Sequence, residues 1–104
     1  MQITFKSPQM GNIVVRLFWS TYRANNRTVL ELIDPRTGEP FTTATVNLPG
    51  VELADDEIIL KDYSENEGML RSLVDAGVVQ DTGRRERTGV VTCPVVRVLR
   101  RCPT

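Results

Sequence analysis

Acidic and amide side chains are concentrated in the segment KDYSENEG at residues 61–68. Such a cluster could serve two kinds of chemistry, because carboxylates bind calcium and also act in pairs as general acid and base. A helix–loop–helix calcium site starting at Asp62 needs glycine at its sixth position and an acid at its twelfth, where this chain has Glu67 and Leu73. The spacing therefore argues against calcium.

Other metals and catalysis are no better supported by the residue types. The chain has no histidine and only two cysteines, Cys93 and Cys102, which excludes the usual transition-metal ligand sets and the Ser-His or Cys-His nucleophile pairs. Exposed carboxylates are ionised at neutral pH, and no phosphate-binding or dinucleotide-binding glycine pattern is present. We expect a non-enzyme without metal or cofactor, in which Cys93 is a buried apolar side chain.

A structural role explains KDYSENEG better. Ser64 and Glu67 have the spacing of a capping box, in which each side chain bonds the backbone amide of the other at a helix start. The apolar residues of the next stretch follow a helical period, and Gly77 stands where a helix ends. We therefore expect a helix from about residue 65 to 76, with exposed acids that remain available for binding.

Alternating apolar residues and turn signals predict strands on either side of this helix. In the long strand at 13–22, Ile13, Val15, Leu17 and Trp19 share the face expected to point to the core. The predicted class is α+β, an antiparallel sheet of five to seven short strands with one helix packed on it. We expect residues 1–104 to form one domain and residues 100–104 to form a frayed tail. The predicted strands lie at 2–5, 13–22, 28–33, 41–48, 57–60 and 90–99, with turns at 24–26 and 34–38 and another strand opening at 78–79.

An arginine-rich hairpin tip is predicted at 83–89, with Arg84, Arg85 and Arg87. These cations can be solvated, paired with the chain's own acids, bound to a protein partner or bound to nucleic-acid phosphates, and the sequence leaves these alternatives open. Pro94 lacks a backbone donor, which indicates a sheet edge or a bulge in the strand at 90–99. A homodimer through that edge also stays open.

The charge of the chain cancels overall but not locally. Thirteen basic and thirteen acidic residues give a net charge of zero, while residues 49–76 carry two basic and eight acidic groups. No segment has the length of a membrane span, and the N-terminus has no apolar signal segment. We expect a cytoplasmic protein that does not bind membranes.

The run TVNLPGVELADDEIILKDYSENEGMLRSLVDAGVVQDTGR at 45–84, with GEPF at 38–41, resembles a family of small uncharacterised proteins of plasmids, conjugative elements and phages. The resemblance implies a mobile-element origin and no known catalytic site. By analogy with other such proteins, it suggests an anti-CRISPR-type inhibitor that binds a CRISPR effector or another nucleic-acid-handling defence complex.

Two binding surfaces follow from these patterns. For a protein partner, the expected surface is acidic, since acidic side chains can occupy sites built for phosphates. The alternative is a nucleic-acid-binding accessory factor for transfer or replication that uses Arg84, Arg85 and Arg87, although direct nucleic-acid binding is less expected. The acidic surface comprises Asp55, Asp56, Glu57, Asp62, Tyr63, Glu65 and Glu67.

Overall fold

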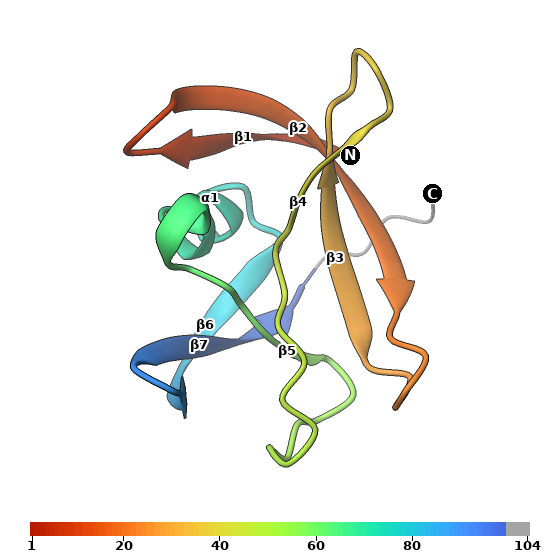
Figure 1. Ribbon diagram of the computed structural model, residues 1–104, viewed down its shortest axis with the longest axis vertical. Helices are drawn as coiled ribbons and strands as arrows, with labels where there is room; N and C mark the ends of the chain where they lie inside the picture. Colours follow the sequence, from red (N-terminus) through yellow and green to blue (C-terminus); the bar gives the residue numbers. More distant parts are fainter. Residues whose placement is uncertain (100–104) are drawn as a thin grey trace.

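A computed structural model describes residues 1–99, so the predicted frayed tail at 100–104 lies outside the described residues. Within residues 1–99, seven strands form two antiparallel sheets around one short α-helix, which confirms the α+β class (Figure 1). The elements are β1 (Gln2–Ser7), β2 (Gly11–Thr21), β3 (Thr28–Ile33), β4 (Pro40–Thr43), β5 (Glu57–Ile59), η1 (Ser64–Asn66), α1 (Met69–Asp75), β6 (Val79–Thr88) and β7 (Val91–Val98).

The first sheet is the predicted meander, in the order β1-β2-β3-β4. Its long strand β2 pairs with β1 over residues 11–16 and with β3 over residues 16–21. Val15 and Leu17 are buried, and Ile13 and Trp19 pack partly buried against the same cluster, as the alternation predicts. Figure 1 shows β2 bending between its two partners.

The strand predicted at 41–48 is shorter in the structure, because the chain changes partner at Ala44. Ala44 N–H still donates to Leu30 O of β3 at 2.8 Å, but Ala44 O accepts from Lys61 N–H at 2.8 Å. Beyond Ala44 the chain lies along β5 and the residues after it, where Val46 N–H donates to Ile59 O at 3.0 Å. Thr45 and Leu60 form an isolated bridge there. This crossing produces two sheets where the sequence suggested one.

In the second sheet, of order β5-β7-β6, β7 is the central strand. The prediction of an edge at 90–99 is therefore wrong, and within residues 1–99 a homodimer has no free edge of β7 to pair with. The bulge predicted in this strand lies in the facing strand β6 instead. The register shifts between Asp81 and Arg85, on the strand opposite Pro94. On its other side, the Pro94 carbonyl accepts a hydrogen bond from Leu60 N–H at 2.9 Å. In an antiparallel ladder the nitrogen and the carbonyl of a residue point to the same side, so the Pro94 nitrogen also faces Leu60 and not β6. Leu60 follows β5, whose last paired residue is Ile59, so the proline lacks a donor only where the β5–β7 ladder ends.

The hairpin tip predicted at 83–89 is also misplaced. The turn consists of Gly89 and Val90, with Thr88 paired to Val91. Gly89 has φ +60°, as a two-residue turn with glycine in first position requires. Gly83, with φ +86°, lies in the bulge instead. The arginines of this region consequently belong to strand β6 and not to the hairpin turn.

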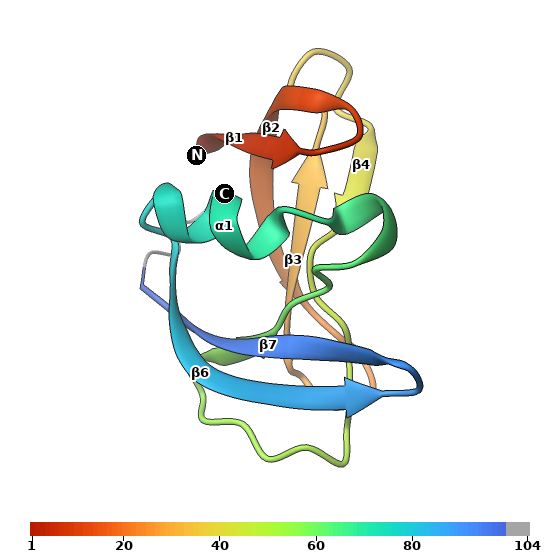
Figure 2. The same cartoon turned by 90° about the vertical axis from the view of Figure 1, so that its left-hand side faces the viewer.

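The helix α1 lies between the β1–β2 hairpin and the β6–β7 hairpin (Figure 2). Met69 and Leu73 are completely buried, while Val74 at the edge of the predicted apolar stripe stays 40% exposed. The main core joins both sheets to this helix. A second, smaller cluster lies beneath the β5–β7 pair and comprises Ile59, Cys93 and Val95 with Val46, Leu48, Val51, Leu53, Tyr63 and Val91.

The start of α1 is in direct contact with β1. Gly68 has φ +97°, and a Cβ placed on it would lie 2.2 Å from Lys6 O. Ser72 Oγ accepts a hydrogen bond from Lys6 N–H at 2.8 Å and donates to Gly68 O at 2.8 Å. The glycine at 68 is therefore required both by its backbone conformation and by the close approach of β1.

This contact predicts a graded result from three glycine-to-alanine variants. Gly50→Ala meets open space at ordinary φ and should change stability little, whereas Gly77→Ala meets open space at φ +73° and should lose about 1 kcal/mol. Gly68→Ala adds the clash with Lys6 O and should lose more than about 2 kcal/mol. Urea denaturation of the three variants measures the order. Equal stability of the Gly68 and Gly77 variants would contradict the contact.

Candidate functional site

The capping box predicted from Ser64 and Glu67 is wrong. Ser64 has φ +57°, and neither η1 nor α1 has a side-chain cap from its N-cap residue. The left-handed Gly68 separates η1 from α1, so the helical segment predicted at 65–76 is in two pieces. The carboxylate of Asp62 caps α1 instead, because its Oδ1 accepts a hydrogen bond from Leu70 N–H at 3.0 Å.

Asn66 is a completely buried polar residue of KDYSENEG. Its Nδ2 donates to Thr43 O at 2.8 Å, and its Oδ1 accepts from Thr42 Oγ1 at 2.7 Å. Asn66 thereby fastens the segment before α1 to β4. Burial without these partners would be costly, so the amide defines where the segment can lie.

Some of the remaining side chains of KDYSENEG make contacts within the protein, and others are free. Lys61 forms an ion pair with Glu65, which lowers the pKa of Glu65 to about 2. The Lys61 ammonium also lies 5.6 Å from the centroid of the Tyr63 ring, and that ring packs on the second cluster. Glu67 is exposed and has no ion pair among residues 1–99. KDYSENEG is mainly a structural junction.

The acids upstream of β5 lie elsewhere. Asp55, Asp56 and Glu57 end a loop that we call the acidic loop, residues 48–57, and Figures 1 and 2 place this loop at one end of the molecule, away from η1 and α1. The structure therefore does not gather the seven predicted acidic-surface residues into one patch. Asp56 forms an ion pair with Arg97 at 3.1 Å, and Asp55 points to solvent without an ion pair within the described range.

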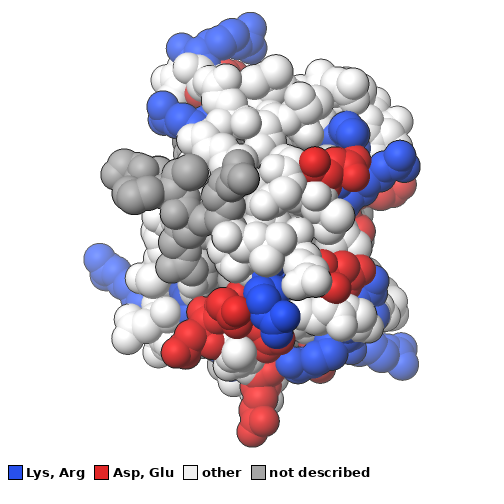
Figure 3. Space-filling view, turned by 180° about the vertical axis from the view of Figure 1, so that it is seen from behind, with Lys and Arg blue, Asp and Glu red and all other residues white. Residues whose placement is uncertain are grey.

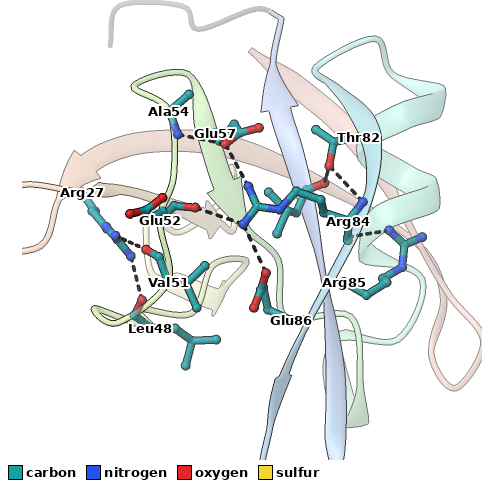
Figure 4. A network of polar contacts seen from close by, with 11 residues as sticks. Arg27, Leu48, Val51, Glu52, Ala54, Glu57, Thr82, Arg84, Arg85 and Glu86 are labelled. Carbon is teal, nitrogen blue, oxygen red and sulfur yellow. Dashed lines mark hydrogen bonds and ion pairs between the residues drawn. The ribbon is translucent and has the colours of Figure 1, made fainter.

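Two arginines hold the backbone of the acidic loop (Figure 4). Arg27, from the turn before β3, donates from Nη1 to Leu48 O at 2.7 Å and from Nη2 to Val51 O. Arg84, from the bulge of β6, donates from Nη2 to Glu52 O at 3.0 Å. A guanidinium can bond two carbonyls at once, so Arg27 fixes the loop at two points.

Glu57 completes this arrangement from inside the loop. Its Oε1 accepts from Ala54 N–H at 2.8 Å and from Arg84 Nη1 at 3.4 Å. Its side chain is only 10% exposed, so it is occupied by structural contacts and not available to a partner. Glu57 belongs to the predicted acidic surface and Arg84 to the predicted basic hairpin, yet the two side chains pair with each other. For Arg84, this confirms the alternative in which the cations pair with the chain's own acids.

The acidic loop rests on the second cluster through Leu48, Val51 and Leu53. Glu52 alternates with the last two and is exposed, so the loop presents Glu52, Asp55 and Asp56 outward. The predicted acidic surface does not include Glu52. The alternation Val51-Glu52-Leu53 could have indicated it, because alternating residues point to opposite sides and the two apolar neighbours favour burial. In Figure 3, acidic side chains gather at the lower end of the molecule, with basic side chains among them.

The basic alternative is largely neutralised by the chain itself. Arg84 contacts Glu57 and also Glu86, at 3.2 Å. Arg85 donates to both carboxylate oxygens of Asp81 at 2.9 Å, and this pairing, followed by the Gly83 amide, holds the pKa of Asp81 below its usual value. Arg87 is exposed and has no ion pair with another residue of the described chain.

Cys93 is the described free cysteine, and it is completely buried in the second cluster, as predicted. Burial raises the pKa of its thiol. Among residues 1–99 no group of three or more His, Cys, Asp or Glu side chains could hold a metal ion, and no helix there is long and apolar enough to cross a membrane. In comparisons with known proteins, no family model, curated protein or solved structure matches this chain.

The contacts of KDYSENEG predict which of its side chains matter for folding. Asn66→Ala should lose about 2 kcal/mol or more, because it leaves the carbonyl of Thr43 without its partner. Asp62→Ala should lose about 1 kcal/mol, as expected for a helix cap. Ser64→Ala and Glu67→Ala should stay within about 0.5 kcal/mol of the unmodified protein. Denaturant unfolding measures all four, and a capping box would instead make the last two the costly ones.

Proposed function

We propose that this protein acts by binding a protein partner, without catalysis, and that the acidic loop is its contact surface. The observation that carries the proposal is the loop's anchorage: Arg27 and Arg84 hold its backbone while Glu52, Asp55 and Asp56 are left outside. A loop already held in one conformation loses little conformational entropy on binding, which favours affinity. Outward carboxylates select a partner with a basic surface.

The proposed partner is a nucleic-acid-handling defence complex, such as a CRISPR effector. Two considerations support it. The resemblance of residues 45–84 to proteins of mobile elements implies an origin in which inhibition of host defence is useful. Complexes that hold nucleic acid present cationic surfaces to phosphates, and an acidic loop is complementary to such a surface. The protein would then act as an inhibitor that occupies the site where nucleic acid binds.

The alternative of a nucleic-acid-binding accessory factor has less support. It needs Arg84, Arg85 and Arg87 to meet phosphates, but the first two already bond carboxylates of their own chain. Breaking those pairs would offset part of the gain from each phosphate contact. A steep loss of binding with rising salt would identify this alternative.

The proposal predicts that charge reversal on the acidic loop abolishes partner capture. The test variant is Glu52→Lys, Asp55→Lys and Asp56→Lys, and its matched control is Glu31→Lys, Glu39→Lys and Glu67→Lys, which changes the net charge equally on other parts of the surface. Loss of the Asp56–Arg97 ion pair should cost little stability, because both side chains are about half exposed.

Both variants are used as bait in nuclease-treated lysate from bacteria with active CRISPR systems. An effector subunit identified by mass spectrometry should be recovered by the unmodified protein and the control, and roughly tenfold less by the loop variant. Equal recovery by both triple variants, with the fold intact by circular dichroism, would refute the acidic loop as the contact. Capture that disappears on nuclease treatment would point to the nucleic-acid alternative.

A further inference from the structure

Strand β2 is left without a neighbour along one part of one edge. Residues 11–16 pair with β1 on one side, and residues 16–21 pair with β3 on the other. Since β3 ends at Ile33, opposite Arg16, the chain turns away at Asp34, and residues 12–15 have no strand beside them on that side. We call this free side of residues 12–15 the edge slot.

The hydrogen-bond alternation shows which backbone groups face the edge slot. Leu17 N–H donates to Met1 O at 2.9 Å, so odd-numbered residues of this part of β2 direct their N–H and C=O toward β1. Asn12 and Val14 therefore direct theirs away from β1. No hydrogen bond within residues 1–99 uses these four groups. They form two donors and two acceptors at the spacing of a β-strand.

A hollow of about 480 Å³ adjoins the edge slot. Its apolar lining includes Val14, which is 54% exposed, and Phe41, which is 36% exposed. Asp34, Pro35 and Arg36, from the turn between β3 and β4, bound the other side. Backbone groups for strand pairing and an apolar space for a side chain thus occur at the same place, as in sites that bind extended peptides.

The outer edge of β6 contrasts with the edge slot. The edge strand β6 is bulged at Gly83 and carries Arg85 and Arg87, and bulges and charged side chains are the features that prevent a strand from pairing with another chain. Residues 12–15 of β2 carry neither a charge nor a register shift. The edge slot is therefore the one of these two edges that is open to pairing.

We propose that the edge slot binds an extended segment of a protein partner, which adds a strand beside residues 12–15 of β2 and places an apolar side chain in the hollow. Positive charge beside the edge slot favours a partner segment that has an acidic residue next to its apolar one. Arg16 is exposed and has no ion pair among the described residues, and the Arg36 side chain is 86% exposed, with a nearest carboxylate contact to Asp34 of 3.5 Å. Both cations flank the edge slot.

The edge slot is separate from the acidic loop. Figure 1 shows the turn between β3 and β4 at the upper end of the molecule and the acidic loop at the lower end. The second site does not rest on the function proposed for the loop, and the triple lysine variant of the loop should bind the same extended peptides as the unmodified protein.

Amide hydrogen exchange followed by NMR tests the free protein first. The amides of Asn12 and Val14 should exchange at least about tenfold faster than those of Ile13 and Val15, which are bonded to β1. A display library of short linear peptides is then selected on the full-length protein, and the enriched peptides are synthesised as probes. Enriched sequences should contain an apolar residue flanked by an acidic one, and their binding should slow exchange at Asn12 and Val14.

The matched variants are Val14→Pro and Val14→Thr. Proline removes a donor that points into the edge slot and leaves the bonds to β1 intact, so Ile13 and Val15 should keep their slow exchange. Peptide binding should weaken about tenfold in Val14→Pro and stay nearly unchanged in Val14→Thr, which keeps the donor and the branched shape.

Three results would overturn the proposal. The first is a selection without binders, and the second is a set of binders that tolerate Val14→Pro and leave the exchange of Asn12 and Val14 unchanged. The third is slow exchange at these two amides that depends on protein concentration alone, because a second copy of the chain would then occupy the edge slot.

Discussion

The fold depends on hydrogen bonds from side chains to the backbone of an irregular segment. Buried N–H and C=O groups need partners, and residues 44–68 contain only the three-residue strand β5 and the turn η1. Asn66 bonds the backbone of β4, Asp62 bonds the first turn of α1, and Arg27 bonds two carbonyls of the acidic loop. Among the described residues no buried side-chain nitrogen or oxygen lacks a partner.

Because backbone groups need partners, some acids of residues 49–76 bond the chain itself and others remain free for a partner. Asp62 and Glu57 are committed to backbone amides, and Glu65 to Lys61. Carboxylates engaged in this way position the chain and offer little to a partner. Glu52 and Asp55 make no such contacts within residues 1–99, and Asp56 has only an exposed ion pair. Of the many acids in this segment, Glu52, Asp55 and Asp56 are therefore left to contact a partner, and all three lie on the acidic loop.

Local patterns predicted most of the elements. Alternation identified the inner face of β2, the turn at Asn26 has the expected left-handed backbone, with φ +58°, and glycine at 77 ends α1. The failures concern contacts between distant parts of the chain. The capping-box spacing could not show that Gly68 must lie against Lys6 and interrupt the helix. The pairing of Arg84 with Glu57 joins residues 27 positions apart, so local patterns present the basic and acidic segments as separate surfaces.

Arg27 and Arg84 hold the acidic loop in one conformation before any partner binds. The most direct test is backbone ¹⁵N relaxation over residues 48–57 in the unmodified protein, in Arg27→Gln and Arg84→Gln, and in Arg23→Gln as an exposed control. We expect order parameters like those of the strands in the unmodified protein and the control, about 0.85. The two anchor variants should fall below about 0.6. Low order parameters for residues 48–57 in the unmodified protein would show that Arg27 and Arg84 do not hold the loop.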